Sequence, residues 1–252
     1  MNIACWSGPR NLSTAMMYSF GARADCAVWD EPFYAAYLAQ TGLNHPMRED
    51  ILDAGETDPT VVAKHCTLPP SGSEPYFYQK HMTHHMLDHY DQTWFDEVVH
   101  VFLIRHPARV LASYSQKREN PTLEDIGFAQ QSQVYDAVLS RGLKAVIIDS
   151  HDIRQQPETM LSKLCDAIGM PFDPAMLAWS QGGHPDDGVW AAHWYNAVHS
   201  STGFAGPEKD LPVLSDDLQT VCEAALPHYD RMKSLAISCP SENSRVIPTT
   251  SL

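Results

Sequence analysis

The first twenty residues carry the feature that most constrains the fold of this chain. An apolar segment at 3–6 is followed by the loop Ser-Gly-Pro-Arg-Asn-Leu-Ser-Thr at 7–14, and then by a helical pattern. Glycine and proline favour a tight turn, so this order predicts a strand, a loop and a helix. The first N–H groups of a helix have no partner inside it, and the helix dipole adds about half a positive charge there. With one cation and two hydroxyls, the loop predicts a binding site for phosphate or sulfate.

Short apolar segments recur along the chain and alternate with helical patterns. The predicted strands are 3–6, 26–29, 76–79, 98–104 and 145–148. The predicted helices lie near 11–22, 107–116, 122–140, 157–168 and 215–235. Continuous apolar strands that alternate with helices are typical of a parallel sheet with helices on both faces. The pattern therefore predicts an α/β three-layer sandwich.

We expect a single domain over residues 1–238. A chain of 252 residues can bury a sizeable core, and neither internal repeats nor a clear linker divides it. Residues 239–252 form a polar tail that we expect to be disordered. The segment 180–213 is rich in Gly, Pro, His and Trp and has no periodicity. It is either an active-site lid or a surface excursion packed by its aromatic residues.

Composition argues against several classes of protein. The net charge of −14 disfavours a nucleic-acid surface, because phosphate backbones require clustered Lys and Arg. The six cysteines are scattered without a C-x-x-C pair, which predicts free thiols and neither a disulfide framework nor a zinc site. No apolar run approaches the roughly 18 residues that span a bilayer, and no signal-type segment precedes the first strand. We therefore expect a cytoplasmic protein with no membrane or nucleic-acid partner.

The loop at 7–14 differs from a Walker A motif. That motif, G-x-x-x-x-G-K-[ST], requires a second glycine and a lysine, and this loop has neither. Metal-dependent ATP chemistry also needs an acidic residue at a strand end to hold magnesium. The strand at 98–104 ends instead in Arg105, so a cation lies at the sheet edge where ligands bind. Ser113 lies about two helical turns beyond it, where the two side chains can bind one further phosphate.

Together, the loop and the Arg105–Ser113 pair resemble the nucleotide-binding segments of the sulfotransferase family, which has a P-loop-NTPase-like fold. The loop is most similar to the Pro-Arg-Ser-Gly-Thr-Thr pattern of tyrosylprotein sulfotransferases, with Asn11 in place of a serine and Leu12 in place of the glycine. The resemblance implies PAPS as co-substrate, with its 5′-phosphosulfate in the loop and its 3′-phosphate on Arg105 and Ser113. The loop residues implied to bind it are Gly8, Pro9, Arg10, Asn11, Leu12, Ser13 and Thr14.

An acceptor hydroxyl or amine needs a base to take its proton, and two segments offer one. Glu31 follows the strand at 26–29, where the resemblance to tyrosylprotein sulfotransferases implies the base; the alternative is a solvated carboxylate in a turn. Lys80 follows the strand at 76–79, where cytosolic sulfotransferases carry a lysine that stabilises the leaving oxygen. The histidine base of that pattern falls on Met82 here, so His81 or His84 would replace it. We favour Glu31 as the base, with His81 second.

Two further features have competing interpretations. His85 and His89 are four residues apart, but no acidic pattern accompanies them, so we expect exposed helix histidines and no metal. Trp190 and Trp194 either stack on adenine or an aromatic acceptor, or pack in the core. The lysine-rich late loop that is typical of sulfotransferases is missing, with only Lys209 nearby.

The sequence predicts an enzyme that moves a sulfuryl group from PAPS to a hydroxyl or amine of a small neutral or cationic acceptor. Arg10, Lys80 and the helix N-terminus would stabilise the transferring group. Two alternatives stay open: a P-loop-type phosphotransferase, and a non-catalytic protein that binds a nucleotide or phosphometabolite. Leu12 and the lack of histidine at position 82 favour the second alternative.

Overall fold

The computed structural model describes residues 1–116 and 120–238. Within these residues the sheet has five strands, and every pair of neighbours is parallel. The strands are β1 (Asn2–Ser7), β2 (Cys26–Asp30), β3 (Tyr76–Met82), β4 (Val99–Ile104) and β5 (Ala145–Asp149). Their order across the sheet is β2-β3-β1-β4-β5. The predicted strands are confirmed, and β3 runs on to Met82, beyond its predicted end.

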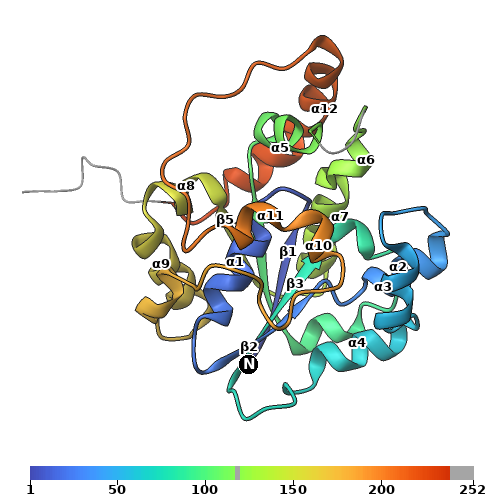
Figure 1. Ribbon diagram of the computed structural model, residues 1–252, viewed down its shortest axis with the longest axis vertical. Coiled ribbons are helices and arrows are strands. Elements are labelled where there is room, and N and C mark those ends of the chain that lie inside the picture. The colour runs from blue at the N-terminus through green and yellow to red at the C-terminus, as the bar shows by residue number, and fades with distance from the viewer. Residues whose placement is uncertain (117–119, 239–252) are drawn as a thin grey trace, which may run out of the picture.

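Helices connect the strands and cover both faces of the sheet (Figure 1). The longer ones are α1 (Ser13–Gly21), α2 (Tyr34–Thr41), α3 (Arg48–Ala54), α4 (Pro59–Thr67), α5 (Pro107–Tyr114), α7 (Phe128–Ser140), α8 (Ser150–Gln155), α9 (Pro157–Ile168) and α12 (Asp216–Lys233). The shorter ones are α6 (Leu123–Ile126), α10 (Ala191–Trp194), α11 (Asn196–His199) and the 3-10 helices η1 (Thr83–His85), η2 (Thr93–Glu97) and η3 (Pro174–Leu177). The helix predicted at 122–140 is divided at Gly127, whose φ of 72° ends α6 and begins α7.

Successive residues of β1 point to opposite faces of the sheet, as the pleat requires. Ile3 and Cys5 pack in one buried cluster with residues of α1 and α9. Ala4 and Trp6 pack in another with residues of α4, α7 and α12. Both faces are therefore covered by helices, and the predicted three-layer α/β sandwich is confirmed.

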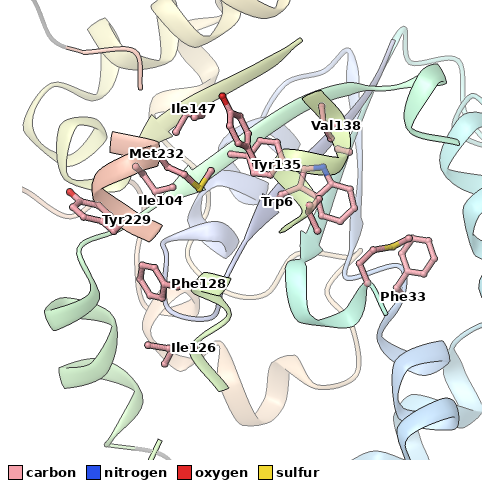
Figure 2. Packing of buried hydrophobic residues seen from close by; sticks show 14 of the residues in the cluster. Trp6, Phe33, Ile104, Ile126, Phe128, Tyr135, Val138, Ile147, Tyr229 and Met232 are labelled. Carbon is pink, nitrogen blue, oxygen red and sulfur yellow. The ribbon is translucent and has the colours of Figure 1, made fainter. Parts of the chain in front are cut away.

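Trp6 belongs to the second cluster, together with Tyr135, Val138 and Phe33 (Figure 2). Its ring stacks on His81 with centroids 4.6 Å apart, and its Nε1 donates to His100 Nδ1 at 3.0 Å. Burial lowers the pKa of His81 to about 3 and that of His100 to about 4. Both imidazoles are therefore neutral parts of the core.

The centre of the sheet sets the position of the functional site. β1 lies between β3 and β4, and the strand order reverses across it. The register pairs Ser7 with Met82 and Trp6 with Phe102, so the three strands end at one edge. In open α/β sheets, ligands bind outside the carboxyl ends of the strands at such a reversal.

No helix in the described ranges has the length and apolar character needed to cross a bilayer. The predicted tail at 239–252 lies outside the described residues.

The buried, neutral His81 predicts that the protein loses stability in acid. The unfolded chain binds a proton at this imidazole near pH 6.5, whereas the folded protein binds it only near pH 3. The stabilisation is therefore complete above the unfolded-state pKa and falls by about 2 kcal/mol between pH 7 and pH 5. Denaturant titrations at these two pH values measure the loss.

His81→Phe keeps a ring against Trp6 and removes the titrating group, so it should lose about 2 kcal/mol less than the wild type over this interval. The exposed His89→Phe is the control and should lose as much as the wild type. An unchanged pH dependence in His81→Phe would contradict the interpretation.

Candidate functional site

A cavity of about 420 Å³ opens at the carboxyl edge of the sheet. Its walls come from the loops after β1 to β4, from α5 and from the late segment. The predicted site residues that line it are Pro9, Arg10, Leu12, Ser13, Thr14, Glu31, Lys80, Arg105 and Ser113. Gly8, Asn11 and His81 do not line it. The structure thus brings most of the predicted residues together, although they come from distant parts of the chain.

The loop between β1 and α1 is shaped by two residues in the left-handed region, Arg10 with φ 63° and Leu12 with φ 73°. Leu12 is the N-cap of α1, and its carbonyl oxygen accepts from Met16 N at 3.1 Å. The N–H groups of residues 13–15 therefore have no partner inside the helix. Because these residues line the cavity, the helix presents an anion-binding N-terminus to it.

Gly8 and Asn11 support the loop from outside the cavity. A Cβ atom at Gly8 would lie 2.5 Å from the carbonyl oxygen of Ile126, so glycine is needed for the loop to approach α6 this closely. The Asn11 side chain is buried, and neither its Nδ2 nor its Oδ1 has a hydrogen-bond partner among the described residues. Such a group is costly to leave unpaired, by about 1–3 kcal/mol. The protein alone therefore does not satisfy the polar groups of this loop.

Arg10 joins the two predicted phosphate-binding segments. Its Nε donates to Ser113 Oγ at 2.8 Å, and Arg105 Nη1 donates to the Arg10 carbonyl oxygen at 2.8 Å. Burial and then the charge of Arg105 lower the pKa of Arg10. An anion bound beside these two guanidinium groups would relieve their repulsion.

Arg105 also pairs with Glu208, a residue that the sequence analysis missed. Arg105 Nη2 and Nε lie 2.5 and 3.1 Å from Glu208 Oε1. Arg154 Nη1 lies 3.0 Å from the same oxygen, and Arg109 Nε lies 2.9 Å from Oε2. Arg154 lies in α8, the helix that follows β5, and Arg105 directly follows β4. The argument that ligands bind at the carboxyl ends of the strands, which found Arg105, would therefore also have found Arg154.

A second charged cluster surrounds the buried Lys80. Its Nζ lies 2.8 Å from Asp30 Oδ1 and 2.5 Å from Glu31 Oε1. The Tyr195 hydroxyl accepts from this Nζ at 2.5 Å and donates to Asp30 Oδ2 at 2.8 Å. Asp30 and Lys80 are register partners of the parallel pair β2–β3, so backbone pairing itself brings the two charges together.

Burial and the neighbouring charges act on the proton affinities of Glu31 and Lys80. Burial raises the pKa of the Glu31 carboxyl; the charge of Lys80 opposes the rise and that of Asp30 adds to it. Burial also acts against the charge of Lys80, but Asp30 and Glu31 outweigh it and raise the pKa of the ammonium. Lys80 is therefore held cationic, while Glu31 has the increased proton affinity that suits a general base.

The late segment 180–213 forms a wall of the cavity, so it is not a surface excursion. Trp190 and Trp194 line the cavity, and Trp190 Nε1 donates to the Tyr195 hydroxyl at 3.0 Å. The backbone N–H of Gly188 donates to Asp30 Oδ2 at 3.1 Å. The segment therefore completes the cluster around Lys80, and the contact of Tyr195 with Lys80 was not predicted from the sequence.

The histidines differ from expectation. Lys80 faces the cavity, and His81, the next residue of β3, points into the core on the other face, where its Nε2 lies 3.2 Å from Gln79 Oε1. It therefore cannot reach an acceptor in the cavity.

His85 lies in η1 and is buried, so the expected pair of exposed helix histidines at 85 and 89 is wrong. His84 and His85 line the cavity. Across residues 1–116 and 120–238, no group of three or more His, Cys, Asp or Glu could hold a metal ion.

The left-handed backbone at Leu12 predicts an unusual order of stability among variants. This conformation costs a residue other than glycine about 1–2 kcal/mol. Leu12 also packs against the cluster that contains α1 and α9. Leu12→Ala loses this packing and keeps the strain, whereas Leu12→Gly loses the packing but relieves the strain. We expect Leu12→Gly to be the more stable variant by about 1 kcal/mol in urea denaturation. The reverse order would argue against strain at this position.

Comparison with known proteins supports the geometry of the fold. Two solved sulfotransferase domains share this P-loop-like α/β fold, one from the Synechococcus PCC 7002 olefin synthase and one from the curacin biosynthetic pathway. Their TM-scores are 0.50 and 0.51, and each is 17% identical to this chain. Both alignments cover 88% of this chain, and they cover 93% and 96% of the two domains.

Two proteins of Arabidopsis thaliana, branched-chain-amino-acid aminotransferase-like proteins 1 and 2, are 37% and 35% identical to this chain over 253 residues. These matches cover 99% of this chain but 45% and 44% of the relatives, so the chain spans less than half of their length. The family model of the sulfotransferase domain matches residues 1–236. Because this match covers nearly the whole chain, the protein belongs to the sulfotransferase domain family.

Proposed function

We propose that this chain transfers a sulfuryl group from PAPS to a hydroxyl or amine of a small acceptor. The observation that carries the proposal is the meeting of Arg10, Ser113 and Arg105 beside the N-terminus of α1. One anionic group of the donor fits the N–H groups of residues 13–15, and a second fits Arg105 and Ser113. Membership of the sulfotransferase domain family supports the same chemistry.

The groups at this end of the cavity suit an anionic co-substrate. Residues 13–15 present backbone N–H groups, Ser13 and Thr14 add hydroxyls, and Arg10 adds a guanidinium. The side of the loop that faces the cavity is therefore rich in hydrogen-bond donors, which a phosphate or phosphosulfate group requires.

PAPS would supply the sulfuryl group, and the side chains would govern the charges and the proton. In the transfer, the bond from sulfur to the donor's phosphate oxygen breaks while a bond from the acceptor oxygen or nitrogen to sulfur forms. Arg10, Lys80 and the N-terminus of α1 stabilise the charge that develops on the leaving oxygen. Glu31 takes the proton of the acceptor. Tyr195 holds the Lys80 ammonium in place through its short hydrogen bond.

The remaining walls suit a small acceptor with an apolar or aromatic part. Tyr34, His85, Trp190 and Trp194 line this part of the cavity. Of the described lining residues, Glu31 carries the acidic side chain. A neutral or cationic acceptor is therefore favoured over a polyanionic one, because an anion would meet this carboxylate in a buried setting.

A magnesium-dependent phosphotransferase has less support. The strand at 98–104 is followed by Arg105, but two other strands do end in aspartates, β2 in Asp30 and β5 in Asp149. Asp30 is paired with Lys80. Asp149 lies 2.9 Å from Lys233 Nζ and accepts from the Tyr229 hydroxyl at 2.7 Å. Because protein cations already neutralise both carboxylates, neither is arranged to hold magnesium.

The nucleotide-binding part of the proposal is tested by ligand-induced thermal stabilisation and by calorimetry with PAP. PAP should raise the melting temperature of the wild type. Arg105→Ala should bind PAP about 10- to 100-fold more weakly, because charge-assisted hydrogen bonds to phosphate contribute about 1.5–3 kcal/mol. The control is Arg141→Ala, which removes an exposed arginine paired with Asp96. Stabilisation by magnesium–ATP and none by PAP would overturn the proposal.

The assignment of the base is tested by transfer of label from PAPS across a panel of small phenols, alcohols and amines. Glu31→Gln should lower kcat by about 100- to 10,000-fold. His81→Phe should retain kcat, because His81 lies outside the cavity. PAP binding that persists without any transfer would favour the non-catalytic alternative.

The pH profile adds a second test of Glu31. A base works when it is deprotonated, so kcat/KM should rise with pH through the pKa of Glu31. Because burial and Asp30 raise that pKa, the acidic limb should lie above the ordinary carboxyl value of 4.5. An acidic limb at or below that value would argue against Glu31.

A further inference from the structure

Glu208 lies at the centre of a cationic cluster that the proposed function does not explain. Its side chain is fully buried, and within the described residues it is paired with the guanidinium groups of Arg105, Arg109 and Arg154. His151 Nδ1 lies 3.4 Å from Glu208 Oε2. Burial opposes ionisation of Glu208, but the hydrogen bond from Arg105 and the charges of the arginines outweigh it and lower the pKa of the carboxyl.

The charges in this cluster do not balance. One carboxylate faces the guanidinium groups of Arg105, Arg109 and Arg154, and Arg10 lies directly beside Arg105. Burying unpaired positive charge is costly, so an excess of this size is unexpected for a purely structural ion pair. Glu208 Oε2 also accepts no hydrogen bond of good geometry from the described residues, despite its short distance to Arg109. The cluster is better suited to an anion with more charge and more oxygen atoms than a carboxylate has.

The contacts of Arg105 show what Glu208 displaces. Arginine binds a phosphate best through two parallel N–H groups on one edge of the guanidinium. On one edge of Arg105, Nε and Nη2 both donate to Glu208 Oε1. On the other edge, Nη1 donates to the carbonyl oxygen of Arg10. A phosphate can therefore engage an edge of Arg105 only when one of these contacts opens.

The chain around Glu208 is held by the same arginines. We call residues 203–210 the strap; Gly203 and Ala205 in it line the cavity. Arg154 Nη2 donates to the carbonyl oxygen of Gly206 at 2.6 Å, and Arg109 donates to that of Lys209. No helix or strand is present between Gly203 and the start of α12. At its start, Gly203 is held by an antiparallel bridge to Ala178 and Phe204 packs on Trp179. The rest of the strap is attached by ion pairs and hydrogen bonds to side chains that a phosphate would also use.

We propose that Glu208 is a displaceable occupant of the second phosphate site, so that the strap competes with the 3′-phosphate of the nucleotide for Arg105 and Arg154. The inference rests on the proposed function and adds a regulatory element to its donor site. In the absence of nucleotide, Glu208 neutralises part of this largely buried positive charge. A phosphate takes over the guanidinium groups and releases the carboxylate. Binding is weakened by the fraction of molecules in which Glu208 holds the site.

Calorimetry with two nucleotides tests the competition. The variant is Glu208→Gln, which keeps the shape of the side chain and removes its charge. The ligands are PAP and AMP, which differ by the 3′-phosphate alone. If Glu208 occupies the site in about nine molecules of ten, the variant should bind PAP about 10-fold more tightly than the wild type does. Binding of AMP should be unchanged, because AMP does not use the second site.

Glu223→Gln is the matched control, because it removes the same charge from an exposed position on α12. It separates direct competition from the general effect of net charge, and its affinity for PAP should equal that of the wild type. Glu208→Ala should act in the same direction as Glu208→Gln. A gain in affinity cannot result from misfolding, so these variants remain informative even if they are less stable.

The opposite result has a clear meaning. If Glu208 instead orients the arginines for the phosphate, Glu208→Gln should bind PAP more weakly, and the competition is overturned. Equal affinity for PAP in the variant and the wild type overturns it too. In both cases PAP still binds the wild type, so the proposed function stands. If neither the wild type nor the variant binds PAP, the proposed function itself fails, and the competition fails with it.

Discussion

The parallel pairing of β1 with β3 and β4 is the constraint on which the site depends. Because the three strands run in the same direction, the chain leaves all of them at one edge of the sheet. The loop at 7–14, Lys80 and Arg105 therefore converge without any long excursion of the backbone. The same pairing between β2 and β3 sets Asp30 beside Lys80 in register. Topology thus places the charged groups, and side-chain packing then adjusts their distances.

One charged cluster has more cations than anions and the other has more anions than cations, and both are largely buried. Around Arg10 and Arg105 cations exceed anions; burial and then the charge of Arg105 lower the pKa of Arg10, and an incoming anion would relieve the repulsion. Around Lys80, among the described residues, two carboxylates share one ammonium; burial raises the pKa of Glu31, the charge of Lys80 opposes this rise, and the charge of Asp30 adds to it. The protein as a whole carries a net charge of −14. Local arrangement, and not net charge, therefore determines which ligand the cavity attracts.

Local signals in the sequence predicted the strands and the loop, because these depend on near neighbours in the chain. The strand-edge argument also found Arg105. Sequence analysis failed where the outcome depended on tertiary contacts. α2 has buried residues on all sides at Tyr34–Leu38, so it shows no amphipathic period. His81 was misplaced because β3 continues to Met82, and one step along a strand moves a side chain to the other face.

The contacts of Tyr195 and Glu208 were not predicted, for a different reason. Each residue lies in a segment without periodicity and acts on a partner about a hundred positions away in the chain, Lys80 in one case and Arg105 in the other. No local pattern reports such contacts. Only the folded chain shows that the late segment contributes one group to each cluster.

Between Tyr195 and Glu208, the late segment is attached to the rest of the protein by further contacts. These contacts determine whether the two charged clusters move together. Asp187 Oδ2 accepts from the Tyr18 hydroxyl at 2.6 Å and lies 2.9 Å from His199 Nε2. Gly203 forms an antiparallel bridge with Ala178. These contacts fix the chain on the Tyr195 side of the strap independently of the arginines. Release of Glu208 would therefore loosen the chain around Glu208 and leave Tyr195 bound to Lys80, so the contacts of one charged cluster can open while those of the other stay in place.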